Sequence, residues 1–222
     1  MKHRSFLILA LTSLLCIAAC APFPKERFYA PRPGEEEFWH YREVGLASWY
    51  GEEYHGRPTA NGEIYDMYAS TAAHRTLPFN TLVRVHNLEN GKITEVRIND
   101  RGPFIPGRII DLSKKGAREI GILATGIARV SLQVIGFSGK YPPSLEGNFA
   151  IQVGSFVEKD NARRLQEELR KKHSQVYIVF WQGHTRSFYR VRIGSFRTEA
   201  EARRYGEFLR QENLPVFIVR ED

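Results

Sequence analysis

Short runs of alternating hydrophobic and polar residues, separated by turns such as Asn90-Gly91, fill the middle of the chain. Alternation with a period of two predicts half-buried β-strands. The strands expected from this pattern are 44–49, 82–87, 94–98 and 127–134. One helix interrupts them: Ser113 is a good N-cap for 114–120, Asp111 favours the helix start, and Gly121 is a natural end. Strands at this spacing indicate a barrel or a sandwich.

A second pattern follows the segment 138–147, whose prolines, glycines and serines indicate a linker. Residues 148–156 recur 40 positions later as 188–196, and the apolar positions that follow keep the same offset. In each half, apolar residues spaced by three and four predict a helix between two strands. Two such units predict a four-stranded antiparallel sheet with both helices on one face and the other face open.

The N-terminus has the pattern of an export signal. Lys2 and Arg4 precede an apolar run that is too short to span a bilayer as a helix. The run ends in Ile17-Ala18-Ala19-Cys20, which resembles a bacterial lipobox. We therefore expect 1–19 to be a lipoprotein signal peptide and Cys20 to carry lipid. An ordinary signal peptide with an incidental cysteine is the alternative.

Residues 20–41 are rich in proline and glutamate and show neither a helical nor a strand period, so we expect a tether. Ala21 after the acylated cysteine resembles the outer-membrane type of lipoprotein, which implies an outer-membrane anchor facing the periplasm. Because Cys16 leaves with the signal and Cys20 carries lipid, no disulfide is expected.

The chain carries 32 Lys and Arg against 25 Asp and Glu, a net charge of +7. Such a charge raises nucleic acid as a partner. An exported protein meets the cell wall and anionic lipid instead, so we predict no nucleic-acid partner. Arg190 and Arg192 alternate along one expected strand, so they share a sheet face that can meet polar glycan or wall phosphate.

Four ionisable side chains lie among loop residues between Trp49 and Pro103: Glu63, Asp66, His74 and Asp100. Their Gly, Asn and Pro neighbours place side chains on loops, where chemistry is usually carried. Carboxylates with an imidazole are the groups that acid/base catalysis uses. For each of them a turn, a cap or an ion pair is the structural alternative.

The motifs around these residues resemble the catalytic domain of the rare lipoprotein A family of septal-ring lytic transglycosylases, a double-psi β-barrel related to barwin and expansin. The matching stretches are 47–51, 55–63, 65–67, 72–78, 97–103 and 108–113. In such enzymes the sugar's own 6-hydroxyl attacks and leaves a 1,6-anhydro end, so one acid/base group can suffice.

The resemblance implies that Asp100 is the acid/base residue, with Glu63 second. It also links His74 to activity, and Asp66 is a fourth catalytic candidate. Arg101 beside Asp100 is expected to lower the pKa of that carboxyl and oppose its use as an acid.

Trp49, Tyr50, Tyr54 and Tyr65 are candidates either for stacking on sugar rings or for filling the barrel core. Histidines and acids occur nearby, but their spacing matches no closed metal site, so we predict no metal and no cofactor.

The repeat resembles the SPOR domain, which binds peptidoglycan strands stripped of their stem peptides at the division septum. The glycan-binding residues expected on its open face and nearby are Gln152, Ser155, Arg190, Arg192 and Trp181. Trp181 is a sugar platform or a cover for the sheet edge. Phe156 and Phe196 are expected to plug the core.

These features together predict a six-stranded double-psi β-barrel at 42–137 and a βαβ-βαβ SPOR domain at 148–222. The favoured function is an endolytic lytic transglycosylase that cleaves peptide-free glycan to 1,6-anhydro products and is targeted to the septum. The alternative is a noncatalytic, expansin-like peptidoglycan-binding lipoprotein. No oligomeric state is predicted.

Overall fold

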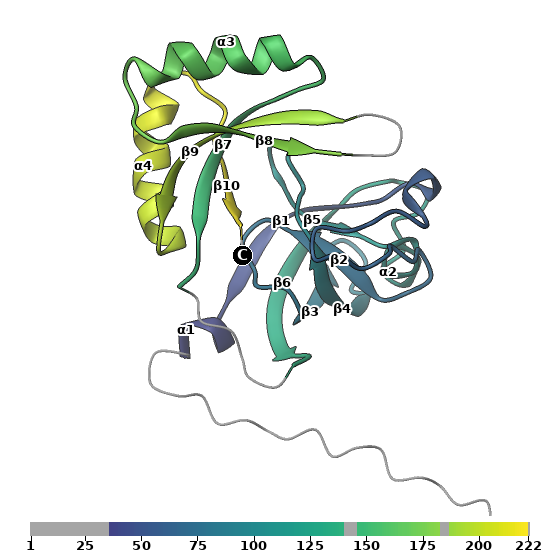
Figure 1. The fold of residues 1–222 in the computed structure, drawn as a ribbon. Helices are drawn as coiled ribbons and strands as arrows, with labels where there is room; N and C mark the ends of the chain where they lie inside the picture. Colours follow the sequence, from purple (N-terminus) through teal and green to yellow (C-terminus); the bar gives the residue numbers. More distant parts are fainter. Residues whose placement is uncertain (1–35, 140–145, 183–186, 222) are drawn as a thin grey trace, which may run out of the picture. The chain divides into compact units, whose positions relative to one another are not determined.

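The computed structural model describes residues 36–139, 146–182 and 187–221 (Figure 1), and these described residues fall in one compact unit. The expected signal peptide 1–19, the lipidation site Cys20 and most of the expected tether lie outside the described residues. In the part of the chain that is described, no helix is both long and apolar enough to span a bilayer.

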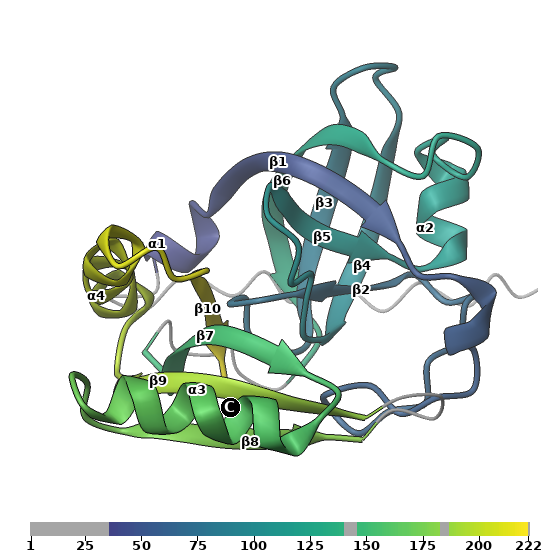
Figure 2. The ribbon, with the colours of Figure 1, turned by 90° about the horizontal axis from the view of Figure 1, so that it is seen from above.

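Six strands close into a barrel in the order β1-β5-β2-β4-β3-β6, and β6 pairs with β1 (Figure 2). The strands are β1 (Arg42–Trp49), β2 (Thr71–His74), β3 (Thr81–Asn87), β4 (Ile93–Asp100), β5 (Arg108–Leu112) and β6 (Ala128–Phe137). The β1/β5 and β2/β4 pairs are parallel and the others are antiparallel. The double-psi barrel implied by the motifs is confirmed.

The four strands expected from alternation correspond to β1, β3, β4 and β6, with ends extended by a few residues. Alternation does not reveal β2 and β5, which are short. All four residues of β2 are buried, so this strand has no polar face to mark it. The alternating apolar residues of the longer strands fill the barrel, among them Val83, Val85, Val96, Ile98, Val130 and Leu132. Burying each such side chain stabilises the fold by roughly 1.5–3 kcal/mol.

The helix expected after Ser113 is α2 (Lys114–Glu119). The Ser113 hydroxyl accepts a hydrogen bond from the Gly116 amide at 3.1 Å, which satisfies a free N–H of the first turn. Gly121 follows with φ of 76°, a left-handed conformation that ends the helix at little steric cost. A 3-10 turn, η1 (Glu52–Tyr54), lies between β1 and β2.

Residues just before the expected start of the barrel at residue 42 also pack against its core. A short helix, α1 (Glu36–Trp39), lies inside the expected tether, and Phe38 is completely buried in the barrel core. Trp39 and Tyr41 pack against the same core. Three aromatic residues in a segment of six are apolar surface that the barrel can cover, so this part of the tether belongs to the folded domain.

The C-terminal module has the expected repeat. Its elements are β7 (Phe149–Phe156), α3 (Lys159–Arg170), β8 (Val176–Trp181), β9 (Phe188–Phe196), α4 (Glu199–Gln211) and β10 (Phe217–Arg220). The sheet has the antiparallel order β10-β7-β9-β8. Both helices pack against it through one core, with Phe156 and Phe196 at its margin, so their expected role as core residues is confirmed (Figure 1).

The sheet face opposite these helices is not open as expected. Gln152 and Arg192, which are cross-strand partners, are only 2% and 7% exposed. Glu221 covers Arg192 through an ion pair of 2.7 Å, and the Phe104 ring lies 6.2 Å from that of Phe217, the neighbour of Gln152 on β10. A half-apolar sheet face finds cover within the same compact unit, which the repeat pattern cannot reveal.

Candidate active site

A cavity of about 430 Å³ lies where β1 ends and β4 passes into its following loop. Aromatic rings and two carboxylates line it, including Trp49, Tyr50, Tyr54, Tyr65, Asp100 and Asp111. Its size and mixed lining suit a small polar ligand with apolar faces. The aromatic candidates therefore line this cleft, and Trp49 also packs against the barrel core.

Asp100 ends β4 and is held by three donors. The backbone amides of Ala60 and Arg101 donate to Oδ1 at 2.9 and 2.8 Å, and the Tyr50 hydroxyl donates to Oδ2 at 2.9 Å. Burial raises the pKa of Asp100, while these hydrogen bonds and the charge of Arg190 oppose the rise. The carboxylate is oriented by the protein rather than by solvent.

The expected effect of Arg101 on the pKa of Asp100 is wrong, because the guanidinium turns away from the carboxylate. It lies 3.7 Å from the Phe79 ring centroid, and its Nη1 donates to the Leu77 carbonyl at 2.9 Å. Its Nε donates to the Arg220 carbonyl at 2.9 Å. It is the backbone amide of Arg101 that donates to Asp100, and the pKa of that carboxyl is raised rather than lowered.

Asp111 is a second carboxylate of the cleft, which the sequence reasoning treated only as a helix-start residue. Ala73 of β2 pairs with Asp100 on one side and with Asp111 on the other. Two strand spacings place these aspartate Cα atoms about 10 Å apart, with both side chains lining one cavity. A signal for Asp111 was its place at the end of a short β-run, which matches that of Asp100.

The surroundings of Asp111 favour its protonated form. Burial raises its pKa, the charge of Asp100 raises it further, and a short hydrogen bond from the Ser48 hydroxyl and the charge of Arg108 oppose the rise. Asp111 thus accepts one hydrogen bond, from a side chain, whereas Asp100 accepts three, one from a side chain and two from backbone amides. Burial raises the pKa of both carboxyl groups, and their hydrogen-bond donors, which stabilise the ionised form, differ in number.

Gly102 lines the cleft in a backbone conformation that favours glycine. Its φ of 152° is a conformation that other residues rarely adopt. A Cβ added there would lie 3.8 Å from both the Ala73 Cβ and Asp111 Oδ2. A larger residue at this position would enter the space beside Asp111.

Glu63 lies outside this cavity lining and is held in an ion pair. Arg97 of β4 donates to both of its carboxylate oxygens at 2.8 Å, and the Asn99 amide donates at 3.0 Å. These bonds, the one from Arg97 above all, lower the pKa of Glu63 to about 2. A carboxylate held ionised in this way is a poor proton donor at neutral pH. It ties the turn that contains Ala60, a donor to Asp100, to β4.

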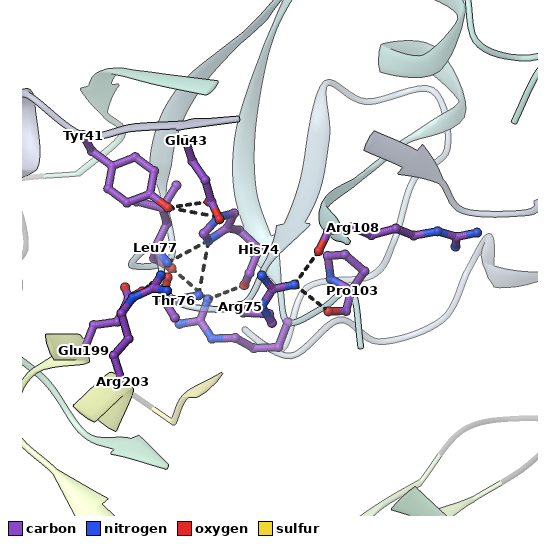
Figure 3. Close-up of polar contacts among 11 residues, drawn as sticks. Tyr41, Glu43, His74, Arg75, Thr76, Leu77, Pro103, Arg108, Glu199 and Arg203 are labelled. Atoms are coloured by element: carbon purple, nitrogen blue, oxygen red, sulfur yellow. Dashed lines mark hydrogen bonds and ion pairs between the residues drawn. The ribbon is translucent and has the colours of Figure 1, made fainter. Parts of the chain in front are cut away.

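His74 also lies outside the cavity lining, in a buried network at the end of β2 (Figure 3). It is 1% exposed, and its Nδ1 accepts the backbone amides of Thr76 and Leu77 at 3.2 and 3.0 Å. The ring proton is therefore on Nε2, which donates to Glu43 at 2.9 Å. The Tyr41 hydroxyl donates to the same carboxylate at 2.6 Å. His74 orients β2, whose Ala73 lies between the two aspartates.

Burial raises the pKa of Glu43, but the hydrogen bonds from His74 and Tyr41, with the charge of Arg75, outweigh it and lower this pKa to about 2. The residue after His74 reaches the next loop: Arg75 Nη1 donates to the carbonyls of Pro103 and Arg108 at 3.0 and 2.6 Å (Figure 3). The network thus fixes both β2 and the loop that follows Asp100.

Asp66 lies on an exposed turn. Its Oδ1 accepts the Tyr68 amide at 2.9 Å, and the His55 ring lies 3.9 Å away. The structure does not bring Asp66 into the cleft with Asp100. Of the four catalytic candidates, therefore, only Asp100 lines the cavity, and Glu63 and His74 contact the elements that position it.

The expected glycan-binding residues separate into two groups. Gln152 and Arg192 are buried, and Gln152 Oε1 and Arg192 Nε are buried without a hydrogen-bond partner. Ser155 is exposed, beside Arg190 across the strands. Arg190 and Trp181 line the cavity that holds Asp100. Among the described residues, no group of three His, Cys, Asp or Glu side chains is arranged to hold a metal ion.

Two family models match the chain. Residues 42–132 match a model described as a lytic transglycolase, and residues 145–220 match a model described as a SPOR domain. The matched segments coincide with the barrel and with the C-terminal module.

A relative from Helicobacter pylori strain J99, named endolytic peptidoglycan transglycosylase RlpA, is 51% identical over 116 residues, which are 52% of this chain and 37% of that protein. A relative of the same name from Vibrio cholerae is 48% identical over 134 residues, which are 58% of this chain and 51% of that protein. The chain thus spans about half or less of the length of these relatives. A solved expansin from Clavibacter michiganensis is similar at 13% identity and a TM-score of 0.36, over 70% of this chain and 79% of that one.

Proposed function

We propose, from the premise that this chain belongs to the rare lipoprotein A family, that it is an endolytic peptidoglycan transglycosylase. The observation that carries the proposal is the cleft. Asp100 and Asp111, whose strand positions flank Ala73, line it together with several tyrosine rings. A pair of carboxyl groups that share one cleft and differ in their hydrogen-bond partners is the arrangement that glycosidic-bond cleavage uses.

In the proposed mechanism the glycan binds with the glycosidic oxygen between the two aspartates. Asp111, which accepts a single side-chain donor, supplies a proton to that oxygen as the bond to C1 breaks. Asp100, which is oriented by three hydrogen-bond donors, acts as the carboxylate that stabilises the positive charge at C1 and takes the proton of the 6-hydroxyl as its oxygen bonds to C1. The products are a free 4-hydroxyl end and a 1,6-anhydro end. Proton exchange through solvent returns both carboxyl groups to their starting states.

Glu63 and His74 act in this mechanism as positioning residues. Glu63 holds the turn that carries the Ala60 amide, and His74 holds β2 between the aspartates. Their replacement should lower turnover through the geometry of Asp100 and Asp111. A catalytic part for Asp66 stays a prediction from the sequence.

The test is mass spectrometry of peptide-free glycan strands incubated with the mature chain. We expect 1,6-anhydro products from the wild type and a loss of turnover of about 10²–10⁴ in Asp100→Asn and in Asp111→Asn, because each loses one proton-transfer group. Amide replacement keeps the side-chain shape, and circular dichroism checks the fold. Reducing-end products would indicate a hydrolase. Uncut glycan that still binds would indicate the noncatalytic, expansin-like alternative.

The proposed place of action is the periplasmic face of the outer membrane, with lipid on Cys20 as the anchor and peptide-free glycan at the septum as the partner of the C-terminal module. The module's match to the SPOR family supports the second part. Fatty-acid labelling of cells that produce Cys20→Ala tests the first. Labelling equal to that of the wild type would rule out this anchor.

A further inference from the structure

The C-terminal module contributes a wall to the cleft that holds Asp100. Trp181 at the end of β8 and Phe188 and Arg190 near the start of β9 line the same cavity as that aspartate. Trp181 and Phe188 are cross-strand partners, with ring centroids 5.8 Å apart. The cleft is therefore assembled from the barrel and from the β8–β9 pair.

Specific contacts hold these two parts together. The Arg220 amide donates to the Arg75 carbonyl at 2.9 Å, and Arg101 Nε donates to the Arg220 carbonyl at 2.9 Å. The rings of Phe104 and Phe217 meet edge to face at 6.2 Å. All three barrel residues lie in the segments that directly follow His74 or Asp100, so the module is fastened to the elements that carry the site.

Arg190 has the surroundings of a ligand-binding group. Its guanidinium carbon lies 4.7 Å from the Phe104 ring centroid and 5.0 Å from that of Trp181. Within the described ranges, the guanidinium makes no hydrogen bond and no ion pair. Burial and the charge of Arg192 lower its pKa to about 10, and the charge of Asp100 opposes this, so Arg190 stays cationic at neutral pH. A guanidinium stacked on rings presents its donors in one plane, which matches a carboxylate.

We propose that Arg190 and Trp181 determine the substrate specificity of the catalytic cleft, by binding a muramyl unit whose lactyl carboxylate is free. In peptidoglycan that carboxyl group is joined to the stem peptide by an amide bond. Removal of the peptide exposes a carboxylate. The planar guanidinium of Arg190 can donate two parallel hydrogen bonds to it while the sugar face stacks on Trp181. An intact stem removes the charge and adds bulk next to a cavity of about 430 Å³. Preference for peptide-free strands is thereby exercised at the site of cleavage.

This proposal rests on the proposed function, so the experiment measures cleavage and discrimination separately. Peptide-free glycan is divided, and in one half the lactyl carboxylates are converted to methylamides. For the wild-type chain we expect kcat/KM and binding affinity to be roughly ten- to hundredfold higher for the free carboxylate, the range expected of hydrogen bonds to a charged group. Arg190→Gln should lose this discrimination. Arg190→Lys should keep only part of the discrimination, because an ammonium group cannot donate two parallel hydrogen bonds to one carboxylate.

Arg163→Gln, an exposed arginine of α3 outside the cavity, is the matched control and should discriminate as the wild type does. Phe104→Ala removes the barrel residue on which Arg190 stacks. The double variant Phe104→Ala with Arg190→Gln should lose less binding free energy than the sum of the two single losses, because the two residues are in contact. Wild-type discrimination in a folded Arg190→Gln, or strict additivity with Phe104→Ala, would overturn the proposal. A wild type that binds with discrimination but never cuts would overturn the proposed function and leave this inference standing.

Discussion

Glu43→Gln is predicted to destabilise the barrel in a way that depends on pH. The substitution keeps the shape of the side chain and removes its charge, while His74 and Tyr41 still point at it. In the folded chain the pKa of Glu43 is lowered from its ordinary value of 4.5 to about 2. The Glu43 side chain is 21% exposed, so solvent screens this interaction only in part.

A pKa depressed from 4.5 to about 2 corresponds to a stabilisation on the order of 3 kcal/mol at neutral pH. Because the folded-state pKa is the lower one, the contribution is fully present above about pH 4.5. It falls as pH drops toward the folded pKa, to about half near pH 3, and it is absent below about pH 2. The Gln variant lacks this component at every pH.

Urea denaturation at pH 7 and at pH 3 measures the difference. At pH 7 the midpoint of Glu43→Gln should lie about 1–2 M urea below that of the wild type, given a typical slope of about 2 kcal/mol per molar. At pH 3 the gap should be about half as large. Glu95→Gln removes an exposed partner of Arg84 and serves as the control, which should change stability by less than about 1 kcal/mol. A gap of the same size at both pH values would refute the reasoning, since the loss would then not come from the charge.

Three further outcomes are expected. Ser48→Ala removes a hydrogen bond that favours the ionised form of Asp111, so the pKa of Asp111 should rise. The alkaline limb of the pH–rate profile should then move to higher pH. If the limb does not move, Asp111 is not the proton donor. Glu63→Gln should lower the free energy of unfolding by less than about 1 kcal/mol, because the ion pair of Glu63 with Arg97 is partly exposed. It should still lower turnover by up to about 10²-fold, because the turn that contains Ala60 loosens. Steady-state kinetics and thermal unfolding of the same variant measure the two effects. Gly102→Ala should lower kcat/KM on peptide-free glycan through strain and crowding beside Asp111, and a variant that unfolds at the wild-type temperature with full activity would contradict this.

Local chemistry explains why much of the fold can be predicted. The strands that become β3, β4 and β6 alternate because one face of each meets the barrel core and the other is more exposed to solvent. The repeat offset predicts the C-terminal module for the same reason, since each helix has one apolar stripe that must cover a sheet. β2 lacks this signal because it is buried on both faces, and only the family motifs indicated six strands rather than four.

The site depends on distances that a sequence does not contain. Asp100 was predicted from its motif, but the pairing of Ala73 with both Asp100 and Asp111 arises only when β2 is inserted between β4 and β5. The direction of the Arg101 guanidinium is set by the Phe79 ring and by carbonyls distant in sequence. For this reason its position next to Asp100 in the sequence did not predict its effect on the pKa of Asp100.

The sequence by itself determined the two folded parts, their order and the residue types available for chemistry, because periodicity, capping and turn propensity act over a few residues. Tertiary structure alone decided which ionisable groups line the cleft and which are buried elsewhere and hold its strands in place. Asp111 is of the first kind and His74 is of the second. It also decided that Arg190 of the module reaches the barrel's cleft. The physical reason is that burial and charge partners, which set a side chain's protonation and its access to substrate, come from strands far apart in the chain.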